Sequence, residues 1–113
     1  MTCFVNTGFE RALKRVRAAL EANDLEIAGE INMGAEPRCR VLLVDSPLLV
    51  FEGIALDRAA GVYFPLHVVV TADGARTAVS TAARSSEGRL PVGAAGPIEA
   101  LEQRVATALC ALE

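Results

Sequence analysis

Apolar residues recur along this chain with two periods, one typical of helices and the other of strands. Spacings of three and four predict a helix from about Thr7 to Ala22 that buries one apolar stripe. Thr7, with Glu10 three residues later, fits a capping box at its start. A second stripe predicts a helix that Pro97 opens near the end of the chain. The two stripes are Phe9, Ala12, Leu13, Val16, Ala19 and Leu20, and then Ile98, Leu101, Val105, Ala108, Leu109 and Leu112.

Alternation of apolar and polar residues predicts the strands in the first half of the chain. A short strand is expected at Thr2–Val5, and residues 24–33 and 38–44 form a hairpin, with Glu30 opposite Arg40. In the second hairpin strand, one face carries Cys39, Val41 and Leu43, and the other carries Arg38, Arg40, Leu42 and Val44.

The strongest alternation runs through residues 62–71 and predicts a strand with two different faces. Its faces are Val62, Phe64, Leu66, Val68 and Val70 on one side, and Tyr63, Pro65, His67, Val69 and Thr71 on the other. Asp73-Gly74 is a two-residue turn into a strand over residues 75–82. This turn would place Val68 opposite Val79 and His67 opposite Ser80.

A middle helix and one long loop complete the chain. In Asp45-Ser46-Pro47, Ser46 or Asp45 caps the helix, and Pro47 takes the first helical position, where its missing N–H costs nothing. Gly61 is expected to end this helix in a left-handed cap. Residues 83–97 are rich in Ser, Gly, Pro and Ala and predict a loop.

The order of these elements predicts an α+β fold in a single domain over residues 1–113. The sequence β-α-β-β-α-β-β-α gives a mostly antiparallel five-stranded sheet with the helices mainly on one face. One layer of helices cannot cover both faces. We therefore expect either that the middle helix wraps round the second face or that another subunit covers it, and we favour a homodimer. The apolar residues expected on that face are Leu42, Val44, Tyr63 and Val69.

Composition and charge exclude several classes of protein. Hydrophobic residues make up 52% of the 113, which suits one packed core. A net charge of −3 argues against a nucleic-acid partner. Three widely spaced cysteines without a C-x-x-C pair argue against a disulfide framework or a zinc site. Because no signal peptide or membrane-spanning run is evident, we expect a soluble, cytoplasmic protein with no membrane partner.

Most of the chain resembles the domain-of-unknown-function family 302. The runs that carry the resemblance are Cys39–Pro47, Ala59–Pro65, Val68–Gly74 and the opening Phe9–Leu20. The resemblance implies an α+β domain related to one repeat of the TATA-box-binding-protein-like fold, often dimeric, with no assigned function. Members often have Cys in place of Asp45 and a polar residue or Cys in place of Leu66. The resemblance therefore carries no thiol chemistry over to this chain.

No set of residues forms a recognisable active site, but four residues are candidates for ligand contact. Asp45 and Ser46 lie at a predicted helix N-terminus, where anions can bind, although Asp45 already places a negative charge there. His67, the only histidine, shares a strand face with Tyr63. It is either a proton carrier in a shallow pocket or a hydrogen-bonded side chain at a subunit interface. We expect no catalytic set, metal or cofactor.

Two functions follow from these candidates. The first is a dimeric, non-catalytic binding or structural module that holds a small ligand or protein partner between the sheet, the middle helix and the neighbouring subunit. The alternative is a small enzyme that uses His67 and Tyr63 in that groove at the dimer interface. A second titratable group within hydrogen-bond reach of His67 would favour the enzyme.

Overall fold

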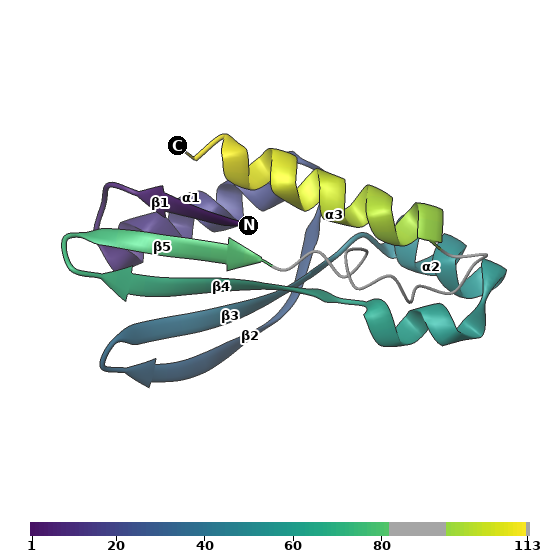
Figure 1. The fold of residues 1–113 in the computed structure, drawn as a ribbon, viewed down its shortest axis with the longest axis horizontal. Helices are drawn as coiled ribbons and strands as arrows, with labels where there is room; N and C mark the ends of the chain where they lie inside the picture. The colour runs from purple at the N-terminus through teal and green to yellow at the C-terminus, as the bar shows by residue number, and fades with distance from the viewer. Residues whose placement is uncertain (82–94, 113) are drawn as a thin grey trace.

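The computed structural model describes residues 1–81 and 95–112, apart from the side chains of Ala60, Val62 and Tyr63. The element order predicted from the sequence is confirmed (Figure 1). The elements are β1 (Thr2–Val5), α1 (Phe9–Ala22), β2 (Glu26–Ala35), β3 (Arg38–Asp45), α2 (Pro47–Leu56), the 3₁₀ helix η1 (Arg58–Tyr63), β4 (Leu66–Asp73), β5 (Arg76–Thr81) and α3 (Ala95–Cys110).

All five strands pair antiparallel in the order β1-β5-β4-β3-β2. The helices α1 and α3 contact each other and cover one face of this sheet, which we call the helix face (Figure 1). The opposite side of the sheet is called the open face. The predicted α+β class, with an antiparallel sheet and helices mainly on one face, is therefore confirmed.

The core lies between the helix face and the apolar stripes of α1 and α3. Both predicted stripes are buried except for Ala19, which is half-buried. From the sheet, the core takes Cys3, Val5, Leu42, Val44, Leu66, Val68, Val70 and Val79. Each element contributes every second residue if it is a strand and every third or fourth if it is a helix, so the periods in the sequence translate directly into burial.

The predicted faces of β2 were wrong, because two bulges interrupt its alternation. Register shifts occur between Ile27 and Gly29 and again between Asn32 and Gly34. A bulge adds one residue to one strand, so every later side chain changes face. Consequently Glu26 lies on the open face and Glu30 on the helix face.

In β3 both predicted faces keep their members, but the buried face is the one that the sequence placed second. Leu42 and Val44, which the sequence placed on the second face, are fully buried on the helix face, opposite Val68 and Leu66 of β4. Glu30 lies opposite Leu42 rather than Arg40, although the side chains of Glu30 and Arg40 still approach each other diagonally.

The second hairpin keeps the predicted faces but differs in register. Asp73 pairs with Arg76, so Gly74 and Ala75 form the turn, and Gly74 takes a left-handed conformation with φ of 62°. The pairing is displaced by two residues from the prediction, and Val69, rather than His67, lies opposite Ser80. A displacement of two leaves every side chain on its predicted face.

The end of the middle helix and the start of the last helix differ from the prediction. Helix α2 ends at Leu56 rather than at Gly61, and η1 follows it, so the strand predicted from residue 62 begins only at Leu66. The predicted position of Pro47 at the start of α2 is confirmed. Helix α3 begins at Ala95, two residues before Pro97. The rest of the loop predicted for 83–97 lies outside the described residues.

The capping box predicted for α1 is wrong. Gly8 is the N-cap residue, and the Thr7 hydroxyl is buried without a hydrogen-bond partner among the described residues. The Thr7 carbonyl instead accepts a hydrogen bond from the Thr77 hydroxyl at 3.0 Å, which ties the start of α1 to β5.

The facing of β3 can be tested with two neighbouring substitutions. Leu42→Ala is expected to lower the free energy of unfolding by about 2–5 kcal/mol, because it leaves a cavity in the core. Leu43→Ala, on the open face, is expected to cost less than about 1.5 kcal/mol. Urea unfolding of dilute protein measures both. A larger loss for Leu43→Ala would restore the facing that the sequence suggested.

Candidate functional site

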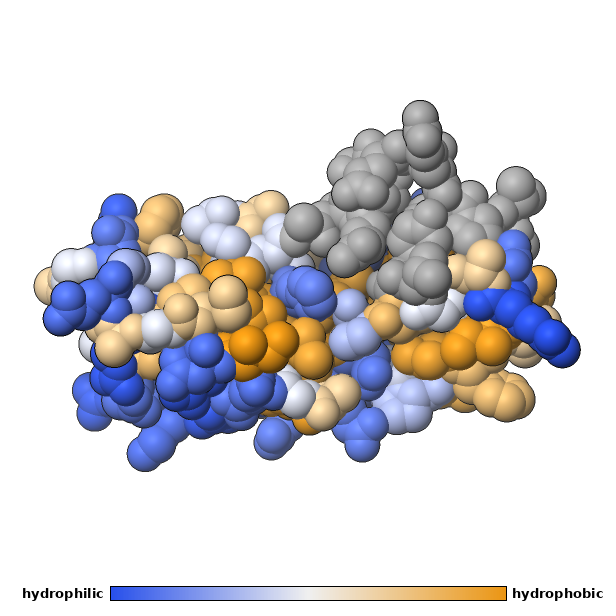
Figure 2. Space-filling model, turned by 90° about the horizontal axis from the view of Figure 1, so that it is seen from below, coloured by the Kyte–Doolittle hydropathy of each residue, from blue (hydrophilic) through white to orange (hydrophobic). Residues whose placement is uncertain are grey.

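The open face is the largest unpartnered feature of the sheet among the described residues. Its centre is apolar and half-buried, and it includes Val41, Leu43 and Val69, with Ile31 and Phe4 at the two edges. Figure 2 shows this side of the molecule, with an apolar area in the middle and polar residues toward the hairpin ends of the strands. The same view shows a second apolar area toward α2.

Two carboxylates lie opposite each other at the end of the open face nearest α2. Asp45 ends β3 and pairs with Glu26 of β2, so the bulge in β2 places the two acids on the same face. Burial raises the pKa of the Asp45 carboxyl above its ordinary value, and the charge of Glu26 raises it further. Like charges opposite each other destabilise a sheet, so Asp45 lowers the stability of the fold at neutral pH.

Ser46 lies next in the chain but points to the other side. Its hydroxyl is almost fully buried and accepts a long hydrogen bond of 3.5 Å from the Arg104 guanidinium of α3. Ser46 is the N-cap residue of α2, but its side chain makes no capping bond. Asp45 and Ser46 are therefore separated by the sheet, and they do not form one site.

His67 is exposed on the open face, opposite Leu43 and diagonal to Asp45. Diagonal neighbours in a sheet are about 7–8 Å apart, a distance that His and Asp side chains can span, but no hydrogen bond joins His67 to Asp45 here. Within residues 1–81 and 95–112 the imidazole has no hydrogen-bond partner. Tyr63 lies in η1 rather than in the strand, and its side chain is outside the described part of the structure.

A thiol and a hydroxyl meet across the same face. The Thr71 hydroxyl of β4 donates to the Cys39 sulfur of β3 at 3.5 Å, and both side chains are half-buried. Cys39 faces the open side of the sheet, and Cys110 is exposed on α3. The described residues contain no group of three His, Cys, Asp or Glu side chains that could hold a metal ion.

Two residues near these candidates were not found from the sequence. Glu26 comes to Asp45 only because of the bulge after Ile27, and Arg104 reaches Ser46 from a helix 58 residues further along the chain. Gly29, which follows the bulge, was the available signal, because an isolated glycine in a strand pattern often marks one. No local sequence pattern predicts the contact between Ser46 and Arg104.

The cost of the Asp45 charge predicts a stabilising substitution. A raised pKa in the folded state means that stability falls as pH rises through it, so Asp45→Asn is expected to raise the free energy of unfolding at pH 7 by about 0.5 kcal/mol. The gain should fade below about pH 3.9, where the carboxyl is neutral in both states. Urea unfolding across this pH range measures it, with exposed Glu52→Gln as the charge control. A loss of stability in Asp45→Asn would contradict the reading.

Comparisons with known proteins agree on the family and the fold. A profile of the family described as "Domain of unknown function DUF302" matches residues 1–109. A solved structure described as "Crystal structure of uncharacterized conserved protein DUF302 from Bacillus stearothermophilus" is similar, with a TM-score of 0.86 and 14% identity over 100% of this chain and 97% of that one. At this identity the likeness shows the fold alone. No curated protein matches the chain. None of the described helices is long and apolar enough to span a membrane.

Proposed function

Because this chain belongs to the family described as Domain of unknown function DUF302, which assigns a fold but no activity, we propose that it is a dimeric, non-catalytic binding module. One observation carries the proposal. The sheet has helices on one face, whereas the centre of the open face consists of Val41, Leu43 and Val69 with no element of the described chain packed over them. Exposed apolar areas of this kind are typical of interaction surfaces.

A second copy of the chain is the partner that fits this face. The five strands, about 4.8 Å apart and about 20 Å long, present a face of roughly 500 Å² in projection. Side chains increase the accessible area beyond that projection, toward the roughly 600–800 Å² that each partner buries in a stable interface. Two such faces can pack on each other as the sheets of a sandwich do, about 10 Å apart.

Helix α2 extends the apolar surface and provides one wall for a ligand. Its side chains Leu48 and Phe51 are 65% and 73% exposed, although leucine and phenylalanine are usually buried. The helix follows β3 directly, beside the end of the open face where Asp45 and Glu26 lie. We place a small ligand or a protein partner between this helix, the open face and the neighbouring subunit, where the carboxyls and His67 would provide the polar contacts.

The alternative enzyme needs a base or acid partner for His67. Asp45 lies diagonal to it rather than in contact, and Ser80, the partner expected from the sequence, lies opposite Val69. A proton carrier without an orienting group is a poor general base, and this favours the binding module over catalysis by His67.

Light scattering at micromolar concentration tests the dimer. We expect twice the mass of one chain for the wild type, and at least tenfold weaker association for Val69→Lys and Ile31→Lys, because each introduces a charge into the apolar interface. Ala18→Lys, on the exposed side of α1, should remain dimeric. Circular dichroism confirms that each variant is folded. A wild type with the mass of one chain would refute the dimer.

A further inference from the structure

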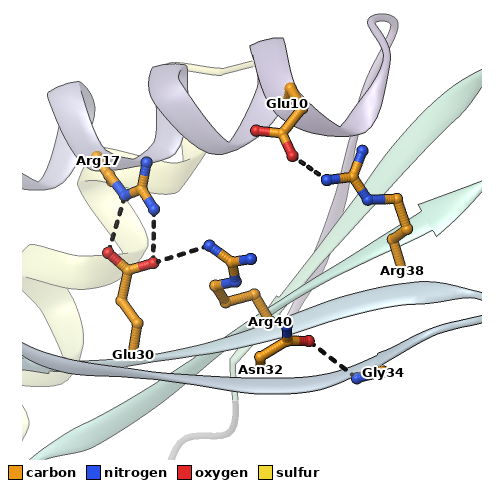
Figure 3. A network of polar contacts seen from close by, with 7 residues as sticks. All are labelled: Glu10, Arg17, Glu30, Asn32, Gly34, Arg38 and Arg40. Carbon is orange, nitrogen blue, oxygen red and sulfur yellow. Dashed lines mark hydrogen bonds and ion pairs between the residues drawn. The ribbon is translucent and has the colours of Figure 1, made fainter.

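Basic side chains gather on the other side of the sheet, between α1 and the β2–β3 hairpin. Arg17 comes from α1, and Arg38 and Arg40 come from β3 (Figure 3). Lys14 lies one turn from both Glu10 and Arg17 on the same side of the helix. We call Lys14, Arg17, Arg38 and Arg40 the basic cluster.

The carboxylate of Glu30 pairs closely with Arg17 and at a longer distance with Arg40 (Figure 3). Arg17 donates to it twice, from Nε at 3.0 Å and Nη2 at 2.6 Å, whereas the nearest nitrogen of Arg40 is 3.6 Å away. The hydrogen bond from Arg17 lowers the pKa of Glu30 most, and the charges of Arg17 and Arg40 add to this against the effect of burial. Glu30 therefore stays ionised and is held mainly by Arg17, with Arg40 as its weaker partner.

Arg40 is left with an unused donor. Its Nε is buried and has no hydrogen-bond partner among the described residues. A buried N–H of a charged group is costly when it is unpaired, so a movement of the Arg40 side chain that brings this N–H to an acceptor would be favourable. Arg38 pairs with Glu10, but both side chains are about half-exposed, and such a pair is easily opened.

The charges of this region do not balance. The four cations of the basic cluster face the carboxylates of Glu10 and Glu30, and Glu21 also acts on Arg17 from the next turn of α1, which leaves one positive charge. A phosphate monoester carries a charge of about −1.5 to −2 at neutral pH and three acceptor oxygens, so it can neutralise this excess and accept hydrogen bonds from more than one guanidinium.

From this arrangement we infer that the basic cluster binds the phosphate group of a small phosphorylated molecule. Arg38 and Arg40 are two residues apart on the same face of β3, about 7 Å along the strand, so their long side chains can converge on one group. Their planar guanidinium groups match the oxygens of a phosphate. Lys14 provides a further cation from the helix side. This site lies across the sheet from the proposed dimer interface and does not depend on it.

Titrations with phenyl phosphate test the inference, and benzoate is the matched carboxylate probe. At constant ionic strength, phenyl phosphate should raise the thermal unfolding midpoint of the wild type, and benzoate should have a much smaller effect. The dissociation constant for phenyl phosphate, measured by NMR titration, should rise at least tenfold in Arg40→Gln and in Arg38→Gln. Arg76→Gln is the control, because Arg76 pairs with Asp73 outside the cluster.

Comparing each variant with and without ligand separates binding from any change in its own stability. Arg38→Gln changes a half-exposed side chain, so this variant still tests binding if Arg40→Gln does not fold. Three results would overturn the inference: no response of the wild type to millimolar phenyl phosphate, an equal response to benzoate, or unchanged binding in both cluster variants.

Discussion

The packing of two amphipathic helices on one face of an antiparallel sheet is the constraint on which the rest of this structure depends. The stripes of α1 and α3 bury most of the apolar strand residues on the helix face, from Val5 on β1 to Leu42 on β3. Because both helices lie on the same side, the other side of the sheet has no partner within the described chain. The apolar centre of the open face is therefore a consequence of topology, and so is the case for self-association.

The bulges of β2 decide which polar groups meet on each side. Without the extra residue after Ile27, Glu26 and Glu30 would share one face, as the alternation in the sequence suggests. With it, Glu26 meets Asp45 on the open face, and Glu30 meets Arg17 from α1. One inserted residue thus produces an unfavourable pair of carboxyls on one side and a favourable ion pair on the other.

The two candidate binding regions share a physical signature. Asp45 is held beside another carboxyl, and the Nε of Arg40 is buried without a partner among residues 1–81 and 95–112. Each arrangement lowers the stability of the isolated chain, and neither is needed to form the core. A bound ligand can supply the interaction that each group lacks, so both regions are candidate binding sites.

The sequence by itself determined the element order, the α+β class and nearly all of the core in α1, β4 and α3, because burial there follows the unbroken periods of the strand and the helix. It also indicated the family. What only the tertiary structure decided is which face of β3 is buried, where β4 begins and which charged groups meet. These depend on single-residue events, such as a bulge or a short 3₁₀ turn, and on contacts between distant segments such as Arg104 with Ser46. A local pattern carries no information about such contacts, since a shift of one residue reverses every face that follows it.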